Sequence, residues 1–129
     1  MLQLHRIHHA AIIVSDYERS KYFYTQVMGL KVIKETYRPE RNSYKLDLSV
    51  NDQDQVELFS FPNPPSRPSY PEATGLRHLA FEVDNLEKAI SEIEYHQISV
   101  EDIRTDKLTG KRFTFFADPD GLPIELYER

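Results

Sequence analysis

The sequence repeats itself once, at an offset of about 69 residues. Residues 9–19 align with residues 78–88, and the two segments share a histidine, an alanine, a valine, a glutamate and the basic residue that follows it. Further along, residues 56–59 align with residues 124–127 at an offset of 68. Two ordered matches at nearly the same offset indicate that one structural unit occurs twice, and this limits the possible folds more than any other feature of the chain.

A proline-rich segment separates the two copies. Five of the eight prolines lie between Pro62 and Pro71. Because proline has no backbone N–H, such a segment forms neither a helix nor a central strand, so we interpret residues 62–75 as a connector. A length of 129 residues is typical of one domain. The sequence therefore predicts a single domain, residues 1–129, made of module 1–61, the connector and module 76–129.

The same order of local patterns occurs in each half. Residues 5–14 and 77–83 are rich in Ile, Val, Phe and Ala, as strands are. Asp16 and Asn85 then stand where a helix N-cap is expected. The remaining strand candidates are 30–37, 44–50 and 55–61 in the first half, and 98–104, 112–117 and 123–128 in the second. Each half therefore predicts a βαβββ module, and the fold class is α+β.

An apolar stripe with helical spacing follows each cap. In the second half the stripe consists of Leu86, Ala89, Ile90 and Ile93. In the first half it consists of Ser20, Phe23, Tyr24, Val27 and Met28. Gly29 is placed to end the first helix as a left-handed cap. The last two strands of the chain are predicted to be joined by a turn at residues 118–121, Asp-Pro-Asp-Gly.

Charge and composition exclude several classes of protein. There are 21 acidic and 16 basic residues, giving a net charge of −5, so nucleic acid is not an expected partner. The longest apolar run, residues 10–14, is too short for a membrane span, and we expect a cytoplasmic protein. With no cysteine there is no disulfide and no thiolate ligand. Any metal must be held by His, Asp or Glu.

Two histidines and two glutamates occupy equivalent places in the repeat: His9 and Glu57 in the first half, His78 and Glu125 in the second. A carboxylate between aliphatic neighbours is costly to bury unless it is paired, protonated or bound to a metal. Either residue type alone is more often structural in a strand, and His8 is a rival to His9. If the modules pack about a pseudo-twofold axis, however, the four side chains converge on one point.

The sequence resembles the vicinal oxygen chelate superfamily, and within it the small bacterial glyoxalase I-like proteins. The resemblance covers the whole chain and is most specific at residues 9–16, 22–30 and 118–126. It implies two βαβββ modules that form an open mixed sheet around a divalent metal. It also implies a homodimer with its sites at the interface. Carried over residue by residue, it implies that His9, Glu57, His78 and Glu125 are the metal ligands.

Two imidazoles and two carboxylates suit Zn, Ni, Co, Mn or Fe(II), and the sequence does not choose among them. In octahedral coordination two positions remain for two adjacent oxygens of one substrate. Such a chelate polarises a carbonyl and stabilises an enediolate. The resemblance implies a lactoylglutathione lyase-like enzyme that isomerises the hemithioacetal of a 2-oxoaldehyde and a thiol such as glutathione, with Glu57 or Glu125 as the base.

Two other functions are considered. An extradiol-type dioxygenase uses two histidines and one carboxylate, and Glu57 would fill a position that its chemistry needs open. A metal-free resistance-type binding module lacks a full ligand set, whereas this chain has one. The substrate is harder to predict because glyoxalase I needs basic residues for the glutathione carboxylates. The candidates are Arg38, Arg41, Arg104, Lys107, Lys111 and Arg112.

Overall fold

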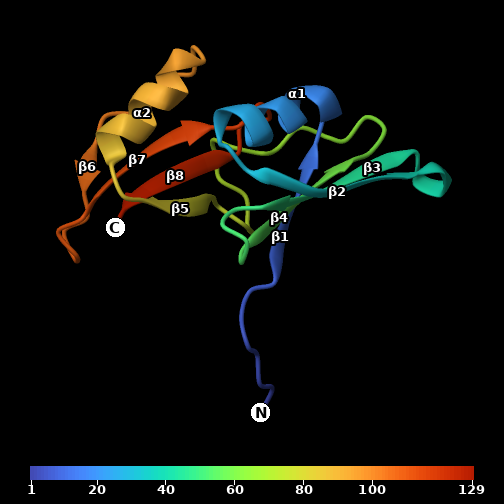
Figure 1. Cartoon of the computed structure of the whole chain (residues 1–129), viewed down its shortest axis with the longest axis horizontal. Coiled ribbons are helices and arrows are strands. Elements are labelled where there is room, and N and C mark those ends of the chain that lie inside the picture. Colours follow the sequence, from blue (N-terminus) through green and yellow to red (C-terminus); the bar gives the residue numbers. More distant parts are fainter. The chain divides into compact units, whose positions relative to one another are not determined.

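The computed structural model describes residues 1–129 and divides them into two compact units, Met1–Pro65 and Ser66–Arg129. Each unit has one mixed four-stranded sheet, coloured from blue to green for the first unit and from yellow to red for the second (Figure 1). The predicted α+β class with two βαβββ modules is confirmed. No helix is long and apolar enough to cross a membrane.

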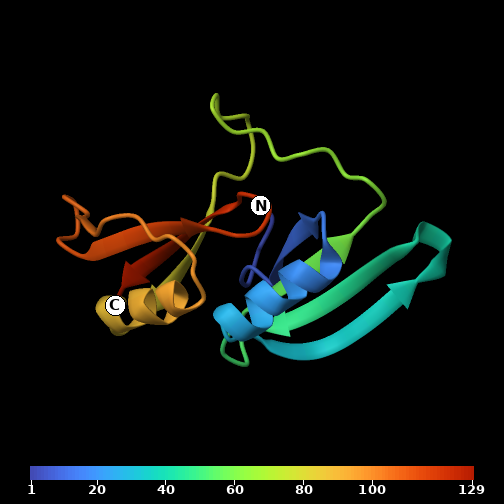
Figure 2. The same ribbon diagram turned by 90° about the horizontal axis from the view of Figure 1, so that it is seen from above.

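The first unit contains four strands in the order β1-β4-β3-β2. Strands β1 and β4 are parallel, and the other neighbours are antiparallel. The elements in chain order are β1 (His9–Val14), α1 (Tyr17–Tyr22), the π-helix η1 (Phe23–Val27), β2 (Lys31–Arg38), the 3-10 helix η2 (Pro39–Arg41), β3 (Ser43–Ser49) and β4 (Gln55–Ser60). Figure 2 shows α1 lying across the sheet of this unit.

The second unit repeats this topology with the strand order β5-β8-β7-β6. Again the first and last strands, β5 and β8, are parallel. The elements are β5 (Leu79–Val83), α2 (Leu86–Tyr95), β6 (Arg104–Thr105), β7 (Arg112–Ala117) and β8 (Pro123–Glu128). The connector predicted at residues 62–75 contains no helix and no strand, as its prolines require.

Three predicted strands are shorter in the structure by two residues or more. The first begins at His9 rather than residue 5, because its parallel partner β4 begins at Gln55, which pairs with His9. The strand expected at 77–83 begins at Leu79. Only residues 104–105 of the segment around 98–104 pair with β7. Upstream of them, the Glu101 N–H donates a hydrogen bond to the Phe115 carbonyl at 2.9 Å. This one backbone hydrogen bond stands in place of continuous strand pairing.

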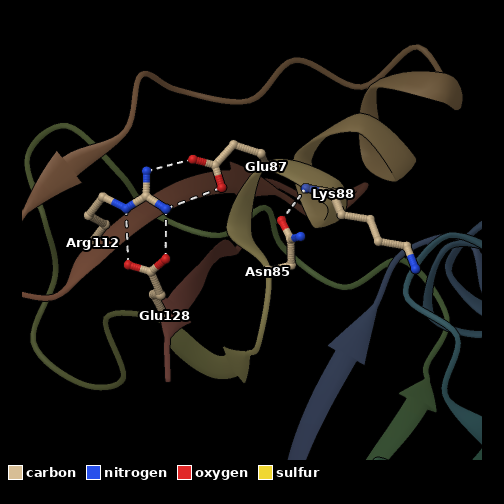
Figure 3. Close-up of polar contacts among 5 residues, drawn as sticks. All are labelled: Asn85, Glu87, Lys88, Arg112 and Glu128. Atoms are coloured by element: carbon tan, nitrogen blue, oxygen red, sulfur yellow. Dashed lines mark hydrogen bonds and ion pairs between the residues drawn. The ribbon is translucent and has the colours of Figure 1, made fainter.

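Both predicted N-caps are confirmed. The Asp16 side chain accepts a hydrogen bond from the Arg19 N–H at 3.1 Å, and Asn85 accepts one from the Lys88 N–H at 2.9 Å (Figure 3). The first helix differs from the prediction in its second half, which widens into the π-helix η1. Gly29 follows it with φ 77°, the left-handed conformation expected there.

Along each strand, side chains point alternately into the core of the unit and toward the opposite face of the sheet. In β4, Val56 and Leu58 are buried beneath α1, and in β8, Ile124 and Leu126 are buried in the same way on the side of α2. The residues between them, Glu57 and Glu125 among others, therefore point to the opposite face of the sheet. Both candidate carboxylates lie on a face that no helix of their own unit covers.

A polar cluster fastens α1 to β2. The Tyr17 hydroxyl donates to Glu35 Oε2 at 2.5 Å, and Lys21 Nζ lies 2.8 Å from the same oxygen. Burial raises the pKa of Tyr17, and the hydrogen bond to Glu35 raises it further. Tyr17 also stacks on Tyr44 at 4.5 Å between ring centroids. These contacts hold α1 at a fixed place on the sheet.

Candidate functional site

The first predicted pair is assembled within unit 1. His9 Nδ1 lies 3.4 Å from Glu57 Oε2, and the Glu57 residue is only 7% exposed. His9 begins β1 and Glu57 lies in the parallel strand β4, where its register partner is Ala11. Because alanine has only a methyl group, Ala11 does not block the approach of the His9 ring to the Glu57 carboxylate.

The second pair is assembled in the same manner within unit 2. His78 Nε2 lies 3.8 Å from Glu125 Oε1. Glu125 is opposite Ala80 in the parallel pair of β5 and β8, two residues after His78, just as Ala11 follows His9 by two. The repeat therefore builds one His–Glu pair per unit, with a small residue opposite each carboxylate.

The donor sets of the two pairs fit a divalent metal. Nitrogen and oxygen ligands at about 2.1 Å from one ion are separated by about 3.0–3.4 Å, close to the 3.4 and 3.8 Å found here. His78 Nδ1 is buried without a hydrogen-bond partner. The structure contains no group of three or more His, Asp or Glu side chains that could hold a metal ion. Each unit brings one histidine nitrogen and one glutamate oxygen together.

The two carboxylates have unlike neighbours on their sheet faces. Glu57 is opposite Asp47 of β3, and Lys45 Nζ lies 3.8 Å from Glu57 Oε1 and 3.6 Å from Asp47 Oδ1. Glu125 is instead opposite Phe115 of β7, whose ring meets the His78 ring edge-on at 5.1 Å. The environment of Glu57 is ionic, whereas that of Glu125 is aromatic.

Sequence analysis assigned no role to three side chains near the first pair: His8, which contacts His9, Lys45, which contacts Glu57, and Asp47, which lies opposite Glu57 and contacts Lys45. His8 Nδ1 lies 2.9 Å from His9 Nδ1, the same ring nitrogen that faces Glu57. Lys45 and Asp47 are two residues apart in β3, a strand that the sequence predicts. Their position near Glu57 depends on the register of β3 against β4, which only the assembled sheet provides.

Of the basic residues considered for substrate binding, Arg112 is held by two carboxylates of its own unit (Figure 3). Its Nη1 lies 2.6 Å from Glu87 Oε1, and its Nη2 lies 2.7 Å from Glu128 Oε1. These hydrogen bonds lower the pKa of both Glu87 and Glu128. Arg112 therefore ties the first turn of α2 to β7 and β8, which is a structural role.

Replacement of Arg112 by Met is expected to destabilise the chain at neutral pH and to have little effect in acid. Glu87 and Glu128 have folded-state pKa values below their ordinary value of 4.5, so their stabilisation is present above that value and is lost as the pH falls through the folded pKa. Urea unfolding of wild type and R112M at about pH 7 and about pH 3 measures this. Lys107→Met, which removes an exposed cation, is the control, and a gap of equal size at both pH values would contradict the assignment.

Comparison with known proteins places these observations in a family. The family model described as Glyoxalase/Bleomycin resistance protein/Dioxygenase superfamily matches residues 6–126. The chain is 64% identical over 126 residues to the uncharacterized protein YwkD of Bacillus subtilis, covering 98% of each chain. It is 27% identical over 124 residues to the lactoylglutathione lyase of Salmonella typhimurium, covering 95% of this chain and 92% of that one.

Solved structures agree with the sequence comparison. A glyoxalase family protein from Enterococcus faecalis superposes with a TM-score of 0.89 at 49% identity, covering 95% of this chain and 97% of that chain. Its fold is the one described above, two mixed sheets with few helices. The chain belongs to the Glyoxalase/Bleomycin resistance protein/Dioxygenase superfamily.

Proposed function

We propose that this protein is a divalent-metal-dependent enzyme of the glyoxalase I type, and that His9, Glu57, His78 and Glu125 hold one ion. The observation that carries the proposal is the occurrence of the same His–Glu pair in both units, at 3.4 and 3.8 Å. The 27% identity to a lactoylglutathione lyase supports the reaction class. Zn, Ni, Co, Mn and Fe(II) all suit this donor set.

A divalent ion bound by these four residues would polarise a substrate carbonyl and make the neighbouring C–H acidic. The carboxylate of Glu125 takes that proton from carbon and returns it to the adjacent carbon, so the reaction is an isomerisation that needs no oxidant or reductant. Glu125 suits this role because Phe115 lies opposite it and its one ion-pair partner is His78, with no lysine or arginine beside it. Glu57 has Lys45 beside it, with Nζ 3.8 Å from Oε1, and this contact favours a ligand that stays in place.

The proposed substrate is a small molecule with two vicinal oxygens, such as the hemithioacetal of a 2-oxoaldehyde and glutathione. The proposed assembly is a homodimer in which one pair from each kind of unit contributes to each site. The two modules and their connector then act together as one functional domain, residues 1–129.

The proposal predicts metal-dependent turnover of the methylglyoxal–glutathione hemithioacetal. Purified protein is stripped with a chelator, reloaded in turn with Ni, Co, Mn, Zn and Fe(II), and assayed for isomerisation. We expect one ion per site, no activity in the stripped protein and recovery with at least one metal. Stoichiometric metal without isomerisation would refute the glyoxalase reaction, and failure to bind any of these ions would refute the metal site.

A further inference from the structure

Arg38, at the end of β2, is held over two aromatic rings. Its guanidinium carbon lies 4.9 Å from the centroid of Phe59 and 5.7 Å from that of Phe61. Its Nη2 donates a hydrogen bond to Ser43 Oγ at 2.8 Å. Stacking and the hydrogen bond together fix the orientation of the guanidinium. Arg38 is therefore an ordered side chain rather than a loosely solvated one.

The guanidinium lies on the same sheet face as the His9–Glu57 pair. Phe59 follows Glu57 by two residues in β4, so the two side chains share a face and their Cα atoms are about 7 Å apart. The register of the sheet agrees, because Lys45 of β3 pairs with Phe59 and Asp47 pairs with Glu57. The Arg38 guanidinium thus lies over the ring of the residue that is two positions from Glu57 in β4.

Arg38 lacks a counter-ion from its own unit. Arg112 contacts two carboxylates and Arg104 lies 3.3 Å from Glu101, whereas the structure pairs Arg38 with no carboxylate. Its Nε is buried and has no hydrogen-bond partner. A guanidinium has five N–H donors and suits a carboxylate in a bidentate geometry. The hydroxyl of Ser43 satisfies only one of these donors.

The surrounding face adds positive charge. In the sheet register, Lys34 pairs with Asp47 and Lys45 pairs with Phe59. Arg38, four residues after Lys34 in β2, therefore lies with Lys34 and Lys45 on the face that carries Glu57. Once Glu57 is committed to a cation, Asp47 is the remaining acidic residue of β2, β3 and β4 on this face. The face then attracts an anionic ligand.

We propose that Arg38 binds a carboxylate of the substrate whose two vicinal oxygens are bound beside Glu57. The substrate class is then that of carboxylate-bearing vicinal-oxygen compounds, with selectivity set by unit 1. The inference rests on the proposed function because it takes Glu57 as a metal ligand. It goes further in naming the charged group that this chain recognises and the residue that recognises it.

The test compares two ligands that differ by one charge, 3,4-dihydroxybenzoate and its methyl ester. Both present two vicinal oxygens, and only the first has a carboxylate opposite them. Their affinities for the zinc-loaded full-length protein are measured by calorimetry for wild type, Arg38→Gln and Arg38→Lys. Arg19→Gln, which removes an exposed cation from α1, is the matched control for net charge.

We expect wild type to favour the carboxylate over the ester by about tenfold, and R38Q to lose this preference while its affinity for the ester is unchanged. R38K, which keeps the charge, retains part of the preference, and R19Q retains all of it. A preference that survives in R38Q, or that falls equally in R19Q, would overturn the role of Arg38. Failure of the zinc-loaded wild type to bind the ester would instead overturn the proposed chelation itself.

Discussion

Glu125→Gln is expected to lower turnover of the methylglyoxal–glutathione hemithioacetal by about a hundredfold or more. Under the proposed function Glu125 is both a ligand and the base, and loss of a positioned general base alone costs about 100-fold to 10,000-fold. A neutral amide also binds a divalent ion more weakly than a carboxylate does. Turnover at saturating metal and metal content after dialysis measure the two effects separately.

Glu92→Gln is the matched control, because Glu92 is an exposed glutamate on α2 and its replacement makes the same chemical change. The control is expected to keep wild-type turnover and metal content. Glu57→Gln should lower metal affinity in parallel with E125Q. Wild-type turnover in both E57Q and E125Q would overturn the assignment of the base and of both carboxylate ligands.

Leu58→Ala is expected to reduce the free energy of unfolding by about 3–4 kcal/mol. Leu58 is fully buried at the centre of β4, between β1 and β3, beneath α1. Its truncation removes apolar contacts and leaves a cavity that the rigid sheet cannot close. The variant is also expected to weaken metal binding, because Glu57 directly precedes Leu58 in the same strand. Urea unfolding monitored by circular dichroism gives the change in stability.

The same substitution at Leu108 provides the comparison. Leu108 is 96% exposed, so Leu108→Ala should change the free energy of unfolding by no more than about 0.5 kcal/mol. If the two variants were equally stable, the core of unit 1 would not depend on the packing described above.

The sequence was sufficient to predict the fold because the repeat and the local patterns agree. Both N-caps, Asp16 and Asn85, and the left-handed Gly29 depend on interactions within a few residues, which a sequence displays directly. The repeat marks His9, Glu57, His78 and Glu125 as equivalent residues, and the structure pairs one histidine with one glutamate in each unit, at 3.4 and 3.8 Å. The expected convergence of all four side chains on one ion stays a prediction.

What the sequence could not provide was the register between strands. The neighbours Lys45 and Asp47 of Glu57 depend on which residues of β3 oppose β4, and no local pattern encodes that choice. The segment before β6 is rich in β-branched residues, yet it pairs with β7 only at residues 104–105. Tertiary contacts there override strand propensity. The widening of the first helix into η1 is equally invisible to a 3.6-residue period.

The parallel pairing of the first and last strand in each unit has a consequence for the order of folding. The hairpins β2–β3 and β3–β4 close short loops, whereas β1 pairs with β4 across 46 residues of chain, as His9 with Gln55. Loops of that length close late because their entropic cost precedes any gain in contacts. Each histidine is on or beside such a late-docking strand, and each glutamate lies on the strand that receives it. Each His–Glu pair therefore forms only when its sheet is complete. A bound ion would then stabilise the product of the last step of assembly.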